Sequence, residues 1–111
     1  MKTSYFAKNG NHKNAVSIAG SCPKNFVGRE YKKLAPHYWF FQKYKEDGDK
    51  DYYIKKYNDL VLEPLNPEEV YNELGEDAVL LCWEKNGKFC HRHLVAKWFK
   101  EKLKNIEISE L

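Results

Sequence analysis

Apolar residues gather in short runs whose spacing predicts four β-strands. Residues 3–7 and 15–19 are rich in β-branched and aromatic side chains, and the polar loop between them contains an Asn-Gly pair. Residues 78–83 are apolar throughout, which is typical of a strand covered on both faces in a parallel sheet. Residues 106–108 alternate between apolar and polar, which predicts an edge strand with one solvated face.

The segments between these runs have the apolar spacing and the end signals of four helices. We expect these helices from Pro36 to Gly48, from Asp49 or Asp51 to Val61, from Asn66 to Gly75 and over residues 91–104. Asn66 is the clearest start, because Asn is a good N-cap and Pro67 suits the first helical position. Strands separated by helices predict one small α/β domain over residues 1–111, three-layered and Rossmann-like, with a mainly parallel sheet of about four strands.

Composition favours a globular domain and narrows the range of partners. Of the 111 residues, 42% are hydrophobic and 32% are charged, which excludes a disordered chain. The net charge of +3 is small for a dedicated duplex-DNA protein, so nucleic acid is not the favoured partner. Ten basic against four acidic side chains in residues 1–50 nevertheless favour an anionic partner.

The sequence carries no signal for export or membrane insertion. Its apolar runs are far too short to cross a bilayer, and no apolar secretion signal follows Met1. The three cysteines are an odd number, which does not suggest a disulfide framework. We therefore expect a cytoplasmic protein with reduced thiols and no membrane partner.

Residues 80–93 hold the densest group of chemically reactive side chains. The apolar strand ends near Cys82, a polar turn follows, and the last helix starts at Cys90, His91 and Arg92. Because no Ser, Thr, Asp or Asn caps this helix, its first N–H groups are free to bind an anion, with Arg92 as a bidentate donor. The helix N-terminus would also lower the pKa of the Cys90 thiol. The alternative is that both cysteines only fill space in the core and its border.

A second candidate segment, residues 20–23, follows the second predicted strand. Parallel strands would bring Ser21 and Cys22 to the same edge of the sheet as Cys90, His91 and Arg92, so that one cleft holds all five. The alternative is a simple turn punctuated by Gly and Pro.

Two stretches of the chain carry a family resemblance, LLCWEK at residues 80–85 and FCHRHLVA at residues 89–96. Together they resemble the signature of the domain of unknown function 488 family, and the likeness extends to residues 3–6, 16–18 and 34–36. The resemblance implies a small α/β domain with a site at Cys82, Glu84, Cys90, His91 and Arg92, and it names no reaction. Many relatives carry an Asp-x-Arg element after the second strand, where this chain reads IAGSC, so that acid–base pair is not expected here.

Three other chemistries stay open for these residues. Zinc has five candidate ligands, namely Cys22, Cys82, Cys90, His91 and His93. We expect no metal, because the spacing of Cys82 and Cys90 fits no usual knuckle and neighbouring helical residues diverge by about 100°. A thiol nucleophile for phosphoryl or sulfur transfer is the second alternative, although the Cys-x5-Arg loop of such enzymes is missing. A redox pair of Cys90 with Cys82 or Cys22 is the third.

The favoured reading is a site for a phosphate-bearing nucleotide or another anionic small molecule, with no further cofactor. We expect catalytic roles for Cys90, His91 and Glu84, with His91 acting as a general base or as a hydrogen-bond donor. We expect the ligand to contact Arg92, Ser21, Cys22, Cys82 and Tyr5. A base would stack on the ring of Tyr5. Whether the site only binds its ligand or also acts on it stays open at this stage.

The alternative function is a non-enzymatic interaction or ligand-sequestering module. The aromatic segment from Tyr38 to Tyr57 offers anchors for a protein partner or a second copy of the chain. Its helical spacing is also that of ordinary core packing. We expect a monomer or a homodimer.

Overall fold

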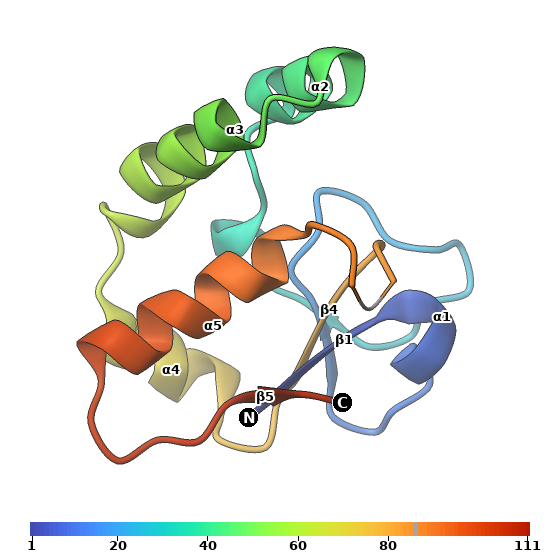
Figure 1. Ribbon diagram of the computed structural model, residues 1–111. Coiled ribbons are helices and arrows are strands. Elements are labelled where there is room, and N and C mark those ends of the chain that lie inside the picture. The colour runs from blue at the N-terminus through green and yellow to red at the C-terminus, as the bar shows by residue number, and fades with distance from the viewer. Residues whose placement is uncertain (86) are drawn as a thin grey trace.

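The computed structural model describes residues 1–85 and 87–111. Its strands form one five-stranded sheet in the order β3-β2-β4-β1-β5, and each pairing between them is parallel. The strands are β1 (Lys2–Tyr5), β2 (Ala15–Ser17), β3 (Arg29–Glu30), β4 (Val79–Cys82) and β5 (Ser109–Glu110). The predicted α/β class with a parallel sheet is confirmed, with five strands in place of about four (Figure 1).

Within the described residues five α-helices lie between the strands, and their ends follow the local capping signals. They are α1 (Phe6–Asn9), α2 (Tyr38–Asp47), α3 (Lys50–Tyr57), α4 (Pro67–Leu74) and α5 (His91–Lys102), with a 3-10 turn at Lys32–Leu34 and a π turn at Asn58–Leu62. Gly48 ends α2 in the left-handed conformation with φ of 69°. The Asp49 side chain accepts from the Tyr52 N–H, and that of Asn66 accepts from the Glu68 and Glu69 N–H groups, so both predicted caps are confirmed.

The two faces of the sheet carry cores of different size. Side chains of alternate residues point to opposite faces of a strand, so Val16, Ile18 and Leu80 join the large core with residues of α3, α4 and α5. Ala15, Val79 and Leu81 instead join Phe6 of α1 in a small cluster. Helices therefore cover both faces, as expected for a small Rossmann-like domain (Figure 1). All of β4 is buried, as its apolar run predicts.

The structure differs from the sequence prediction at both ends of the chain. The first strand ends at Tyr5 in place of residue 7, because the chain turns into α1, where the Gly10 N–H donates to the Phe6 carbonyl. The strand expected at residues 106–108 is wrong. Ile108 is buried in the large core, and the following residues pair with β1 as β5.

No helix in the described ranges has both the length and the apolar character that a membrane crossing requires. The longest of the five α-helices, α5, has 12 residues, whereas a bilayer span needs about 20.

Candidate functional site

A cavity of about 390 Å³ lies where β2 and β4 end. The two strands are neighbours in the sheet, and the chain leaves them in opposite directions, from β2 to β3 at one edge and from β4 to β5 at the other. In open α/β sheets such a switch point at the carboxyl ends of the strands is where ligands bind. Its wall comes from four segments: Ala19, Gly20 and Ser21 after β2, Cys82, Trp83 and Glu84 at the end of β4, Cys90 and His91 at the start of α5, and Pro36, Tyr38, Phe41 and Lys45 at and before α2.

The cavity brings together five of the eight residues singled out from the sequence. These five are Ser21, Cys82, Glu84, Cys90 and His91. The other three, Tyr5, Cys22 and Arg92, are absent from its wall. The ends of β2 and β4 therefore meet at the cavity, and Tyr5, Cys22 and Arg92 lie outside its wall.

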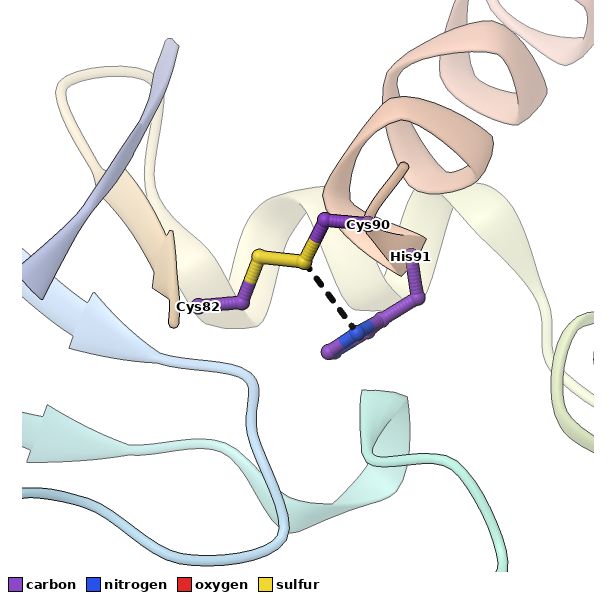
Figure 2. Close-up of side chains that lie close together, drawn as sticks. All are labelled: Cys82, Cys90 and His91. Atoms are coloured by element: carbon purple, nitrogen blue, oxygen red, sulfur yellow. Dashed lines mark hydrogen bonds between the residues drawn. A yellow bond between two sulfur atoms is a disulfide. The ribbon is translucent and has the colours of Figure 1, made fainter. Parts of the chain in front are cut away.

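Cys82 and Cys90 are joined by a disulfide (Figure 2). It links the end of β4 to the residue before α5, and the two side chains are only 1% and 6% exposed. The sequence predicted reduced thiols, so the bonded pair differs from that expectation. A nucleophilic role for Cys90 belongs to the dithiol form, because a disulfide sulfur carries no thiolate.

His91 is a buried imidazole with defined roles for its two nitrogens. Nε2 lies 2.6 Å from the Ile18 carbonyl oxygen, and since a carbonyl only accepts, Nε2 carries the proton and donates. Burial lowers the pKa of His91 to about 4, so the ring is neutral at pH 7. Its unprotonated Nδ1 lies 3.8 Å from Cys90 Sγ. His91 therefore presents a lone pair, and no positive charge, to the sulfur pair.

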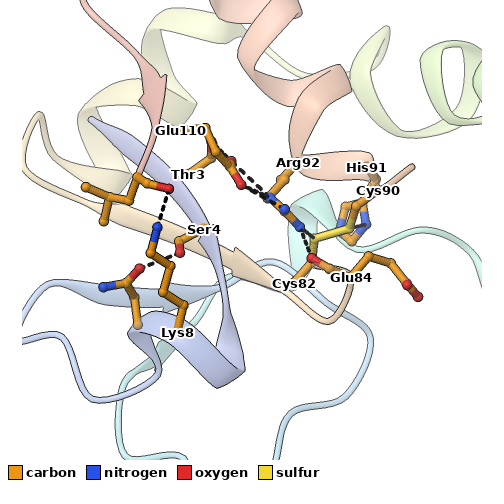
Figure 3. A network of polar contacts seen from close by, with 11 residues as sticks. Thr3, Ser4, Lys8, Cys82, Glu84, Cys90, His91, Arg92 and Glu110 are labelled. Carbon is orange, nitrogen blue, oxygen red and sulfur yellow. Dashed lines mark hydrogen bonds and ion pairs between the residues drawn. A yellow bond between two sulfur atoms is a disulfide. The ribbon is translucent and has the colours of Figure 1, made fainter. Parts of the chain in front are cut away.

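Arg92 is fully buried and its guanidinium is engaged inside the protein (Figure 3). Nε and Nη2 donate to the Glu110 carboxylate at 2.8–3.2 Å. Nη1 donates to the Glu84 carbonyl at 2.7 Å and to Cys82 Sγ at 3.0 Å. The guanidinium carbon lies 5.8 Å from the centre of the Tyr5 ring. Arg92 thus ties α5 to β5 and to the end of β4, and it contacts two residues of the cavity wall without lining the cavity itself.

Glu84 and Lys45 supply the charged side chains among the described wall residues. Lys45 Nζ of α2 lies 3.3 Å from a Glu84 carboxylate oxygen, and both side chains are more than 40% exposed. Ion pairs at such exposure contribute little, typically about 0–1 kcal/mol. A ligand can therefore separate Lys45 from Glu84 at small cost and use either side chain.

Residues 7–103 match a family described as the active DUF488-N3 subclade, DUF488-N3a. The chain belongs to the DUF488 family. The matched region contains every residue of the cavity wall, from Ala19 to His91. No curated protein and no solved structure matches the chain. The family description names no substrate and no reaction.

Aromatic side chains form much of the wall in this DUF488 domain. Trp83 is half exposed, and its Nε1–H donates to the Ser21 carbonyl at 2.9 Å, which joins the segment after β2 to the segment after β4. Tyr38, Phe41 and Lys45 lie three and four residues apart on α2 and so share one face of that helix. The sequence assigned no role to Lys45, and it predicted that the aromatic residues from Tyr38 to Tyr57 either anchor a partner or pack in the core. The mixture of aromatic and cationic residues on one helical face was the signal for them.

Cys22 and Tyr5 lie outside the cavity for different reasons. Cys22 is a free, half-buried thiol that packs against the small cluster with Phe6 and Leu81, and burial together with nearby Glu30 raises its pKa. A raised pKa leaves Cys22 protonated and weakly nucleophilic. Tyr5 ends β1, next to Cys82 in the register, and its ring lies against Arg92.

Proposed function

We propose that this DUF488 protein binds a small molecule with a planar ring and an anionic group, a nucleotide being the type, in the cavity between β2 and β4. The observation that carries the proposal is the convergence on this cavity of five chemistry-bearing residues from three separate segments. Its volume of about 390 Å³ falls within the range of small-molecule sites. The switch-point position supports the same conclusion.

The anionic group would lie between Lys45 and the first turn of α5. Cys90 caps that 12-residue helix without a side-chain hydrogen bond, and although the His93 N–H donates to the Cys90 carbonyl, the backbone N–H groups before it are the proposed donors to a ligand. The helix dipole adds partial positive charge at this end. Arg92 was the anion ligand expected from the sequence, and its contacts with Glu110 and Glu84 move that role to Lys45 and the backbone.

The planar ring would lie against the exposed aromatic side chains of the wall. Tyr38 is 75% exposed and Trp83 is 50% exposed, which is unusual for such large rings. Stacking of a base on an aromatic ring contributes about 1–3 kcal/mol. The Glu84 carboxylate, once separated from Lys45, accepts hydrogen bonds from a ribose or a base.

Calorimetry and thermal unfolding with adenosine monophosphate, adenosine and inorganic phosphate test this proposal. We expect the monophosphate to bind most tightly, because it uses both the ring contacts and the charged contacts. Lys45→Gln should weaken monophosphate binding about tenfold, or ~1.4 kcal/mol, and leave adenosine unaffected. Trp83→Ala should weaken both ligands.

Lys55→Gln is the matched control, because Lys55 is exposed on α3, pairs with Asp59 and is absent from the cavity wall. It should leave binding of all three probes unchanged. Binding that survives both Lys45→Gln and Trp83→Ala would place the ligand elsewhere. Absence of binding by every probe would contradict a nucleotide-type ligand.

A second candidate function is interaction with a protein partner or a second copy of the chain. Tyr38 and Trp39 at the start of α2 are 75% and 51% exposed, and aromatic residues of this kind dominate interface energetics. Sedimentation over a range of protein concentrations tests this candidate. A mass that doubles with concentration and returns to the monomer in Trp39→Ala supports it, and a constant monomer mass contradicts self-association.

A further inference from the structure

Three metal-binding atoms converge at the wall of the cavity. Cys82 Sγ, Cys90 Sγ and a ring nitrogen of His91 lie within 4.8 Å of one another, and all three residues are buried (Figure 2). We propose that the dithiol form of this protein binds a zinc ion through Cys82 Sγ, Cys90 Sγ and His91 Nδ1, with the fourth coordination position open to the cavity. This proposal depends on the positions of these three atoms and is independent of the proposed nucleotide.

The ligand set and its spacing suit zinc. Two thiolates and one imidazole are typical zinc ligands, at about 2.3 Å for sulfur and about 2.0 Å for nitrogen. Those bond lengths place tetrahedral ligand atoms about 3.5–3.8 Å apart. Cys90 Sγ and His91 Nδ1 are already 3.8 Å apart. The Cα atoms of Cys82 and Cys90 are 7.1 Å apart, so the two sulfurs can separate after reduction without any backbone movement.

The contacts around the three ligands are those that support a metal site. The Nε2–H of His91 donates to the Ile18 carbonyl, which leaves Nδ1 as the unprotonated atom directed toward the sulfurs. Metal-binding histidines almost always have such an outer hydrogen bond. Nη1 of Arg92 lies 3.0 Å from Cys82 Sγ, where its charge stabilises a thiolate. Neither contact is needed to hold a disulfide.

The backbone of Cys90 removes the objection that the sequence raised. Two neighbouring helical residues point about 100° apart and rarely reach one metal. Cys90, however, is the N-cap of α5 with an extended backbone at φ −153° and ψ 149°, and only His91 is helical. Their side chains therefore converge, which the one-residue spacing within a regular helix would prevent.

The open fourth coordination position would allow the proposed zinc ion to act on a ligand in the cavity. Structural zinc sites use four protein ligands, whereas catalytic sites use three and keep one position for water or substrate. Cys82, Cys90 and His91 all line the cavity, and Glu84 lines the same wall. Zinc held by Cys82, Cys90 and His91 would activate a water molecule for attack, which is the chemistry that catalytic zinc sites supply. Hydrolysis of a cavity-bound ligand is the reaction class that this arrangement favours.

The disulfide and the proposed zinc ion cannot be present together, because both use the sulfur atoms of Cys82 and Cys90. Reduction by a thiol breaks the S–S bond, gives Cys82 and Cys90 one hydrogen each, and converts two molecules of the reductant into a disulfide. Binding of Zn²⁺ then releases the two thiol protons to solvent. In the reverse exchange the disulfide of the reductant takes two electrons and two protons to give two thiols, while the thiolates of Cys82 and Cys90 form the S–S bond and release the ion.

Metal analysis of the full-length protein tests the proposal, with zinc alone as the probe. The protein is reduced with a water-soluble phosphine, which takes the oxygen of water to become a phosphine oxide, and is then loaded with zinc and desalted. Native mass spectrometry should find one zinc per chain in the reduced protein and none in the oxidised protein. A reduced protein that keeps no zinc overturns the proposal.

Variants assign the ligands. Cys82→Ser and Cys90→Ser should each abolish stoichiometric zinc, and His91→Ala should weaken binding at least tenfold. Cys22→Ser is the matched control and should retain one zinc, because Cys22 packs in the small cluster on the other face of the sheet. Loss of zinc in Cys22→Ser, or full retention in Cys90→Ser, overturns the assignment.

Cobalt in place of zinc gives a readout that needs no variant. Cobalt bound to the reduced, unaltered protein should show thiolate-to-metal charge-transfer absorption together with the visible bands of a tetrahedral site. An octahedral spectrum without thiolate bands overturns the proposal even if the serine variants fail to fold. Because no nucleotide is present in these measurements, their outcome is separate from that of the Lys45→Gln experiment.

Discussion

His91 and Arg92 are neighbours in the sequence but serve two different regions of the molecule. His91 faces the end of β2, where it donates to the Ile18 carbonyl and lines the cavity. Arg92 faces β5 and the end of β4, where it donates to Glu110 and Glu84 and has no part in the cavity wall. Successive residues of a helix point about 100° apart, so one turn of α5 supplies both regions.

The two regions differ in how completely their polar atoms are used. All three nitrogen atoms of the guanidinium donate to acceptors within the protein, as expected of a buried charge that holds elements together. The His91 ring uses one nitrogen for the backbone and leaves the other facing a sulfur at the cavity. A buried group with all its partners supports the fold, whereas a buried group with a free lone pair beside a cavity is available for chemistry.

Removal of Arg92 should have the largest effect on stability. Arg92→Met leaves the partly buried Glu110 carboxylate and the Glu84 carbonyl without their donor, and we expect a loss of about 3–5 kcal/mol in the free energy of unfolding. Urea denaturation measures the loss. Lys97→Met, an exposed position of the same helix, should cost less than about 0.5 kcal/mol. A loss below about 1 kcal/mol in Arg92→Met would contradict a role for Arg92 in stabilising the fold.

Removal of the His91 hydrogen bond should have a smaller effect. His91→Phe keeps a ring in the core but leaves the buried Ile18 carbonyl without a donor, which costs about 1–3 kcal/mol. His91→Gln keeps an N–H donor and should recover part of that loss in the same urea experiment. Equal losses in the two variants would mean that packing beside Tyr57, and not the hydrogen bond, is what His91 contributes.

The dependence of the unfolding free energy on pH should reveal the interaction between Arg92 and the Glu110 carboxylate. Burial alone would raise the pKa of Glu110, but hydrogen bonds from Arg92 and Thr3 outweigh it and hold the pKa below its usual value of 4.5. A lowered folded-state pKa stabilises the fold above the unfolded value, and that contribution is lost as the pH falls below about 4.5 through the folded value.

Unfolding free energies measured from pH 6 down to pH 3 test this dependence. The native protein should lose stability more steeply over this interval than Glu110→Gln, which has no titrating group at that position. Parallel curves for the two proteins would show that Glu110 does not contribute the pH dependence.

A change in the cavity wall should have the smallest effect on stability. Trp83→Phe removes the hydrogen bond to the Ser21 carbonyl from a half-exposed side chain, so we expect a loss of about 0.5–1.5 kcal/mol. The same variant should still weaken a bound nucleotide measurably, because the smaller ring stacks less well. A stability loss as large as that of Arg92→Met would show that Trp83 belongs to the structural region instead.

Local patterns predicted the elements that are stabilised locally. The strand at β4 follows from a continuous apolar run, and α3 and α4 start at Asp49 and Asn66 because each side chain caps its own helix. β3 was missed, and the C-terminal edge strand was placed at residues 106–108 instead of at β5, because each strand has only two residues and its pairing depends on a neighbouring strand. Pairing between distant segments leaves no periodic signal in so short a stretch.

The residues of the candidate site also include some that the sequence predicted and some that it did not. The meeting of Ser21 with Cys82, Cys90 and His91 was predictable, because parallel strands end at one edge of the sheet. Lys45, Tyr38 and Phe41 were missed because the packing of α2, and not any motif, brings them to the cavity. The partner of Arg92 is Glu110, which is 18 residues away in the last strand, and no helical or strand spacing connects the two.

The sequence by itself determined the α/β class, most helix ends and the two segments that meet at the switch point. Each of these depends on interactions between residues close in the chain, or on the rule that parallel strands share an edge. Only the tertiary structure decided that Arg92 holds the C-terminal strand, that Cys22 lies on the other face of the sheet and that Cys82, Cys90 and His91 converge. These outcomes depend on backbone conformation at single residues and on contacts across the sheet, which spacing along the chain does not encode.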